Sequence, residues 1–406
     1  MATVFAQPMH DDSFEARTDL KEPDTSNSSS ETGRISSTSS LSDCSYGSGN
    51  SGHSHTPSND CPPCPYVVGF STTAVGHEPP NPFGPDYTTR YPDQTLNSAD
   101  LSHQEICFST SRLPGHTLSN HTMALTITST IRVGAQTGPQ VVVVNHKLIA
   151  KIYDPMYYDS TEYSDVVKCA DRAYSREAAA YSHLKQFPEV SEDIPAFHGT
   201  WTIDVKSTFS KEGGAASRSR TVHLILLEHL QGRCMASIDP HTLSEPARSA
   251  ILKQCINAEI RILHTGLAHR DLAPSNIILV GTDYKTPNLQ VKVIDFDFCE
   301  LFAHPTYSDQ EYVRRKKEFY ARWAPKLVNP VKRHFCSLED FACDGWCSDD
   351  ENERNNWLWE TFGHDQQYIP VKWDPNDPGA CPRYVDVEGH TDDSDFPDFE
   401  SDDEEA

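Results

Sequence analysis

Short apolar runs, separated by polar and turn-forming residues, predict several β-strands in this chain. Residues 141–144 and 147–153 form two neighbouring runs, and residues 222–227 form a third. Two later runs, residues 277–280 and 289–294, have the same character. Runs of this length are typical of buried strands. The pattern therefore predicts strands with longer helical stretches inserted between them.

The clearest helix covers residues 165–185, and it carries one unexpected charge. Its core-facing residues recur three and four positions apart, which places them on one face: Ala170, Tyr174, Glu177, Tyr181 and Leu184. A carboxylate among core-facing side chains is costly unless a cation meets it. Lys151, in the second strand, is the candidate cation. The alternative is a tilted helix that leaves Glu177 in water.

A group of polar residues follows the next helical stretch. Asp271 belongs to a His-Arg-Asp triplet and lies five residues before Asn276, and Asp295 follows the last predicted strand. Phosphoryl transfer to a hydroxyl group needs a carboxylate that accepts the proton, an amide oxygen for Mg²⁺ and a second carboxylate on that metal. The three residues supply these groups with the spacing of a kinase catalytic loop.

Nucleotide-binding groups are predicted upstream of this loop. Lys151 ends its strand in the Ala-Lys form that places a lysine on ATP phosphates. The strand of residues 222–227 continues into a segment whose backbone would contact adenine, through Glu228 and Leu230, with Leu227 at the back of the pocket.

A turn with two glycines, Gly134 and Gly138, stands where a phosphate-covering loop would lie. The three-glycine pattern of such loops is absent. Two glycines alone are also typical of an ordinary hairpin turn, so only their position favours phosphate binding.

With these residues in view, the chain resembles the protein kinase-like superfamily, and most closely the divergent kinase-like proteins of filamentous fungi. Residues 150–155 and 177–181 carry the nearer likeness, which extends over residues 106–340. The resemblance implies an α+β, bilobal fold with a β-rich small lobe and a helical large lobe. It also implies that ATP and Mg²⁺ bind between the lobes.

Roles for individual residues follow from this resemblance. Lys151 would hold the phosphates and Glu177 would orient it. Asp271 would be the catalytic base, and Asn276 and Asp295 would bind Mg²⁺.

Three departures from the family pattern leave the phosphate acceptor open. Asp297 replaces the glycine of Asp-Phe-Gly, no Ala-Pro-Glu motif follows, and Ala273 stands where many serine/threonine kinases have lysine. The first two features are similar to aminoglycoside and choline kinases, whereas Arg270 is typical of protein kinases. The candidates are a protein kinase acting on Ser, Thr or Tyr, a small-molecule phosphotransferase, and a non-catalytic nucleotide-binding scaffold.

Charge divides the chain into three parts. The net charge of −25 is concentrated at the ends, with −9 in residues 1–100 and −19 in residues 339–406, which leaves +3 for residues 101–338. Fifteen serines and few large apolar residues in the first sixty positions are typical of disorder. We therefore expect a disordered Ser/Pro-rich region (1–100), a kinase-like domain (101–340, with its lobes meeting near residue 230), and an acidic, largely disordered tail (341–406).

The remaining features concern location and partners. No signal peptide or membrane-length apolar run is visible, and twelve scattered cysteines are typical of reduced thiols, so we expect a cytoplasmic or nuclear protein. The expected partners are a protein or small hydroxylated substrate, with no nucleic acid and no membrane, and the acidic tail is a candidate partner-binding segment. A cluster of soft ligands whose spacing matches no known zinc pattern leaves zinc open: His334, Cys336, Cys343 and Cys347.

Overall fold

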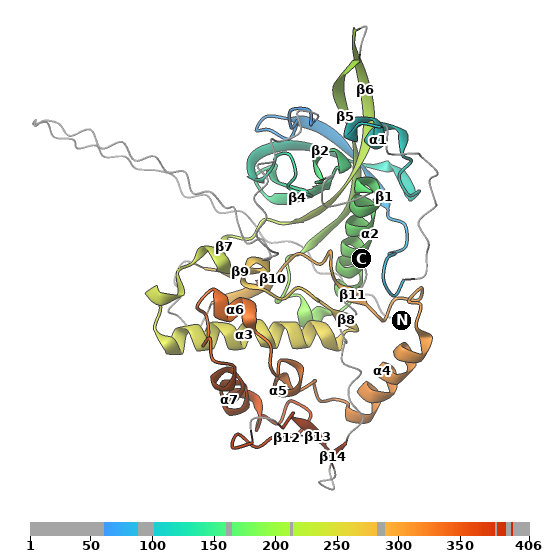
Figure 1. Cartoon of the computed structure of the whole chain (residues 1–406). Coiled ribbons are helices and arrows are strands. Elements are labelled where there is room, and N and C mark those ends of the chain that lie inside the picture. Colours follow the sequence, from blue (N-terminus) through green and yellow to red (C-terminus); the bar gives the residue numbers. More distant parts are fainter. Residues whose placement is uncertain are drawn as a thin grey trace, which may run out of the picture. The chain divides into compact units, whose positions relative to one another are not determined.

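Six antiparallel strands close into a barrel in the order β1-β2-β3-β4-β6-β5 (Figure 1). Successive side chains of a strand point to opposite faces. In β4, Ala150 and Ile152 therefore enter the barrel core, whereas Lys151 and Tyr153 face away from it. The strands are β1 (Ser71–Glu78), β2 (His116–Arg132), β3 (Gln140–Val144), β4 (Leu148–Tyr153), β5 (Phe197–Lys211) and β6 (Gly214–Glu228).

The computed structural model describes residues 61–87, 101–159, 165–211, 214–281, 289–377, 380–386 and 391–392. All of these belong to one unit of the chain, Pro57–Ala406. Within this described part, no helix is both long and apolar enough to span a bilayer.

The N-terminal disorder prediction is wrong for residues 61–87. This segment contains β1, which pairs with β2 and β5, and its Ala74 is fully buried. β1 consists mainly of small and polar residues, so its sequence shows no apolar run. The rest of the predicted disordered region, residues 1–60 and 88–100, lies outside the described residues.

Two helices pack near the barrel. α1 (His103–Ser109) begins with a capping box between Ser102 and Glu105. α2 (Val166–Leu184) starts at Asp165, whose side chain accepts a hydrogen bond from the Lys168 N–H. Its buried face contains all five residues of the predicted stripe, including Glu177.

The second part of the fold combines helices with short antiparallel strands. α3 (Glu245–His264) is followed by Gly266 at φ +97°, where a Cβ would meet the Ala303 Cβ at 2.6 Å. The remaining strands are β7 (Gly232–Cys234), β8 (Leu267–Ala268), β9 (Ile277–Val280), β10 (Gln290–Val293), β11 (Glu300–Leu301), β12 (Val371–Lys372), β13 (Arg383–Val385) and β14 (Thr391–Asp392). The remaining helices are α4 (Gln310–Trp323), α5 (Pro330–Arg333), α6 (Glu339–Cys343) and α7 (Glu351–Phe362). Mixed helices and antiparallel sheets confirm the α+β class.

The predicted boundary at residue 340 is also wrong. α7 and β13 belong to the core, because Leu358 and Phe362 are fully buried and the Tyr384 ring lies 5.4 Å from the Phe319 ring of α4. Acidic residues dominate the composition of this region, but it also contains enough aromatic residues to form a packed layer. Only residues 393–406 of the predicted tail, with two short gaps before them, lie outside the described residues.

This packing can be tested with Leu358→Ala. Removing a fully buried leucine side chain should lower the free energy of unfolding by about 2–5 kcal/mol. The exposed neighbour Glu360→Ala should change it by no more than about 0.5 kcal/mol. Urea unfolding measures both. Equal stability of the two variants would mean that α7 does not contribute to the core.

Candidate active site

The centre of the site is Lys151, which forms one buried and one partly buried ion pair. Its Nζ lies 2.5 Å from Glu177 Oε2 and 2.5 Å from Asp295 Oδ1, and its side chain is 6% exposed. The alternation of β4 turns Lys151 toward α2, and the helical periodicity of α2 turns Glu177 toward the strand. The pair expected from the sequence is thus in contact, and the tilted-helix alternative is not observed.

Each charged group of this cluster shifts the pKa values of its neighbours. Burial alone would lower the pKa of Lys151, but the negative charges of Asp295 and Glu177 outweigh burial and raise that pKa. Burial would raise the pKa of Asp295, and Lys151 instead holds it below its usual value. For Glu177, the effect of burial is larger than the opposing effect of the Lys151 charge, so the pKa of Glu177 is raised. The raised pKa of Lys151 keeps its ammonium group charged, and the lowered pKa of Asp295 keeps that carboxylate ionised.

Tyr153 is a member of the cluster that the sequence analysis missed. Its hydroxyl donates a hydrogen bond of 2.5 Å to Glu177 Oε2. The available signal was its position two residues after Lys151, on the same face of the strand. Glu177 Oε1 is buried and has no hydrogen-bond partner among the described residues. One carboxylate oxygen is thus held by two donors, while the other remains free to receive one.

Asp297 adds a third carboxylate. Its Oδ2 lies 3.9 Å from Lys151 Nζ, and burial together with the negative charge of Asp295 raises its pKa. The sequence indicated only that a glycine hinge is absent here. The structure shows in addition that the replacing side chain faces the lysine.

The predicted catalytic loop is held by its own side chains. Asn276 Nδ2 donates to Asp271 Oδ2 at 2.7 Å and to the Asp271 carbonyl at 2.8 Å. The Ile294 N–H donates to the Asn276 carbonyl at 2.9 Å, and His269 Nε2 lies 2.9 Å from the Ile294 carbonyl. These contacts continue the β9–β10 ladder and place the Asp271 loop next to the segment that carries Asp295.

Backbone strain occurs on both sides of this junction. Arg270 and Asp295 have φ values of 69° and 68°, in the left-handed region that residues other than glycine rarely adopt. Such a conformation costs about 1–3 kcal/mol per residue and persists only when the surrounding structure imposes it. Strained residues cluster at functional sites, which agrees with the roles expected for these loops.

The predicted adenine-binding segment follows β6. Leu227 is buried, and the Glu228 N–H donates to the Ala196 carbonyl at 2.9 Å. The Leu230 N–H makes no backbone hydrogen bond with any residue that the structure describes. Leu230 thus offers a donor of the kind adenine requires, although its role stays a prediction.

The two-glycine turn is occupied by a side chain of the protein itself. Gln140 Oε1 accepts from the Gly134 N–H at 2.7 Å, and its Nε2 donates to the Gly134 and Gly138 carbonyls at 3.1 and 2.9 Å. A phosphate that used the Gly134 N–H would have to displace Gln140. Phosphate binding by this turn stays a prediction.

Asn276 and Asp295 provide the oxygen donors that Mg²⁺ prefers, so the residues present fit this metal. In the described part of the chain, no group of three or more His, Cys, Asp or Glu side chains could enclose a metal ion. Mg²⁺ does not need such a cage, because it is usually held by one or two carboxylates together with phosphates and water. The candidate zinc ligands do not converge either, and His334 instead lies 3.3 Å from Glu259.

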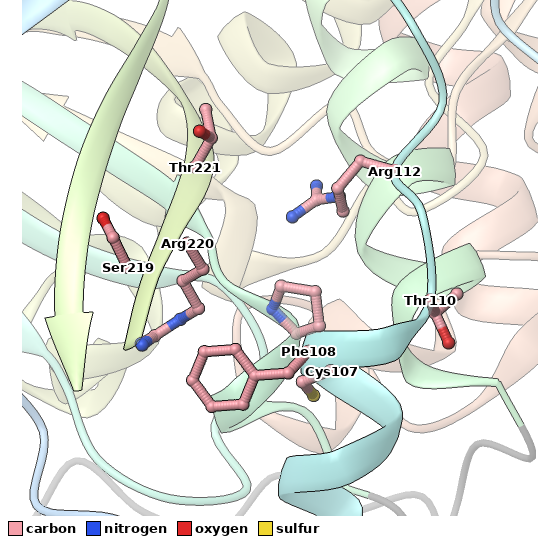
Figure 2. Close-up of a pocket in the computed structure, with 8 residues that line it drawn as sticks. Cys107, Phe108, Thr110, Arg112, Ser219, Arg220 and Thr221 are labelled. Carbon is pink, nitrogen blue, oxygen red and sulfur yellow. The ribbon is translucent and has the colours of Figure 1, made fainter. Parts of the chain in front are cut away.

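A separate hollow of about 180 Å³ lies beside the barrel, between α1 and β6 (Figure 2). Two arginines line it, but both are already paired, Arg112 with Asp171 and Arg220 with Asp154. Because these carboxylates neutralise the guanidinium groups, we assign no ligand to this hollow.

Known proteins resemble this chain only weakly. No protein-family model matches the chain. A crystal structure of WbdD is similar with a TM-score of 0.31 and 12% identity over 48% of this chain and 37% of that one. A second WbdD structure, with a kinase inhibitor, has a TM-score of 0.31 and 14% identity over 50% and 39%. A third, described as the bifunctional kinase-methyltransferase WbdD, has a TM-score of 0.27 and 14% identity over 45% and 33%. The chain thus spans less than two fifths of each WbdD chain, and a likeness of this size leaves function to be judged from the site.

The ion-pair cluster predicts the effect of Lys151→Met. Removing one partner of a buried pair costs about 3–5 kcal/mol, because the other charge stays buried. Burial raises the pKa of Glu177, so protonation favours the folded state and the loss should be larger at about pH 8 than at about pH 5. Urea unfolding at both pH values measures this. The control is Lys147→Met, at an exposed turn, and an equal loss in the two variants would contradict the buried pair.

Proposed function

We propose that the chain is an ATP- and Mg²⁺-dependent phosphotransferase with a bilobal protein kinase-like fold, acting as a protein kinase on Ser, Thr or Tyr hydroxyl groups. One observation carries the proposal. Lys151 is held by both a helix carboxylate, Glu177, and Asp295, while Asn276 fixes Asp271 on the adjoining loop. Kinase chemistry uses this combination of groups in this chain order.

Lys151 carries the positive charge that binding of a phosphate group requires. An ammonium group has three N–H donors, and two of them point to Glu177 and Asp295. The third has Asp297 Oδ2 nearby at 3.9 Å, beyond hydrogen-bond distance, and we assign this third donor to a phosphate oxygen. When bound, Mg-ATP would supply the phosphoryl group and the metal charge that compensates it, and Asn276 and Asp295 would hold the metal.

Asp271 would position the acceptor hydroxyl and accept its proton at a carboxylate oxygen. The Asn276 amide donates to Oδ2, so Oδ1 is the oxygen that we assign to the hydroxyl. A base held in one orientation accelerates transfer mainly by positioning the attacking oxygen.

A small-molecule phosphotransferase is the second candidate. Asp297 and the missing Ala-Pro-Glu motif favour it, because both depart from the peptide-substrate platform of protein kinases. A non-catalytic scaffold is the third candidate. The occupation of the glycine turn by Gln140 favours it, whereas the full set of polar residues around Lys151 and Asp271 does not.

Binding of the nucleotide is tested by thermal shift. Mg-ATP should stabilise the full chain, by about 2.7 kcal/mol at a hundred times its Kd, and ATP without Mg²⁺ should stabilise it less. Lys151→Met should reduce the shift, and Lys147→Met should not. No shift at millimolar Mg-ATP would remove the nucleotide from the proposal.

Chemistry is tested by comparing two carboxylates. Asp271→Asn should lower kcat by about 10²-fold or more with ATP affinity nearly unchanged, because the base does not contact ATP. Asp295→Asn should lower both, because it removes a metal ligand. Labelled ATP with peptides and hydroxylated metabolites as parallel acceptors measures turnover and separates the first two candidates. The exposed Asp349→Asn is the control, and full turnover in Asp271→Asn would overturn the assignment of the base.

A further inference from the structure

We propose that Tyr87 and Arg176 form a clamp that positions the carboxylates around Lys151, an inference that rests on the proposed function of this site. Tyr87 lies in the segment after β1, and Arg176 lies in α2 directly before Glu177. Both hold the segment that follows Asp297. They are positioning residues, because neither contacts Lys151.

The first half of the clamp is a set of buried hydrogen bonds. Arg176 Nη2 donates to the Cys299 carbonyl at 2.5 Å and to the Phe298 carbonyl at 3.2 Å. The Leu301 N–H donates to the Tyr87 hydroxyl at 2.6 Å. The guanidinium group of Arg176 lies over the Tyr87 ring, 5.4 Å from its centroid, so the two residues also bind each other.

The second half extends the contact toward α4. Tyr87 forms a β-bridge with Tyr307, and their rings lie 5.6 Å apart. The Ser308 N–H and hydroxyl both donate to the Asp86 carbonyl, at 2.6 and 2.8 Å. Figure 1 shows the segment after β1, in blue, reaching the chain that precedes α4, in orange. Residues 301–308 are therefore held at both ends by residues 86–87, and Arg176 holds the two residues 298 and 299 that precede them.

The geometry connects this clamp to the ion pairs. Arg176 and Glu177 are adjacent in α2, and Cys299 follows Asp295 by four residues. One contact therefore limits the movement of both carboxylates that hold Lys151. In addition, Glu300 lies 4.0 Å from Arg270 and pairs through β11 with β8. Tyr307 is itself buried in this arrangement, with 3% of its surface exposed.

A purely structural role makes a different prediction from a positioning role. If the clamp only added stability, its loss would lower the melting temperature and leave kcat unchanged in the folded protein. If it positions the carboxylates, its loss lowers kcat more than it changes KM for ATP. A substitution that keeps part of the clamp should then restore part of kcat.

The experiment uses the full chain with Arg176→Met, Arg176→Lys, Tyr87→Phe and the exposed control Ser182→Ala. Tyr87→Phe removes only the acceptor of the Leu301 N–H, so this variant should fold. Hydrogen–deuterium exchange without nucleotide should accelerate about tenfold in peptides from residues 298–308 and in α2 of Arg176→Met, and at Leu301 in Tyr87→Phe. Exchange in β9 and β10 should not change.

Turnover of the same proteins provides the second readout. Arg176→Met should lower kcat about tenfold or more with KM for ATP changed less than about threefold, and Arg176→Lys should recover part of the loss. Unchanged exchange, or accelerated exchange with unchanged kcat, overturns the clamp. If the unaltered protein transfers no phosphate, the proposed function is wrong, and the exchange data alone decide whether residues 86–87 and Arg176 hold this segment.

Discussion

The structure depends on one buried positive charge, the ammonium group of Lys151. Its ion-pair partners come from separate elements, Glu177 from α2 and Asp295 from the segment after β10. A buried ion without a partner costs several kcal/mol, so none of the three groups is tolerated alone. Barrel, helix and loop must therefore assemble together for this charge to be compensated.

The β9–β10 hairpin contributes the second constraint. Its register pairs Ile277 with Val293, and the hydrogen bond from the Ile294 N–H to the Asn276 carbonyl extends the ladder by one step. Because backbone ladders are rigid, the two loops that leave this end of the hairpin have a fixed separation. The metal-binding groups expected on those loops are thus positioned by the backbone and do not depend on flexible side chains alone.

Local patterns predicted the parts of the fold with strong periodicity. The strands of residues 141–144 and 147–153 and the helix of residues 165–185 match β3, β4 and α2 closely. The contact between Lys151 and Glu177 was predictable because a charge on an apolar helix face requires a partner. Tyr153 was predictable in principle from the same strand alternation.

Other parts depend on contacts that no local pattern contains. Tyr87 and Leu301 are 214 residues apart in the chain, so only the folded protein shows that they meet. The packing of α7 and β13 does not follow from composition, because the acidic residues of this region outweigh its aromatic ones, whereas burial depends on which residues face inward. Composition counts the residues on both faces of a helix or strand, whereas only the residues on the inward face pack in the core.

β1 has a further consequence for the behaviour of the protein in a crowded solution. A strand at the edge of a sheet exposes unpaired N–H and C=O groups, which can pair with a strand of another molecule. β1 pairs with β2 on one side and with β5 on the other, and it thereby covers edges that these two strands would otherwise present. A strand of mainly small and polar residues thus leaves β2 and β5 with fewer unpaired backbone groups through which copies of the chain could associate.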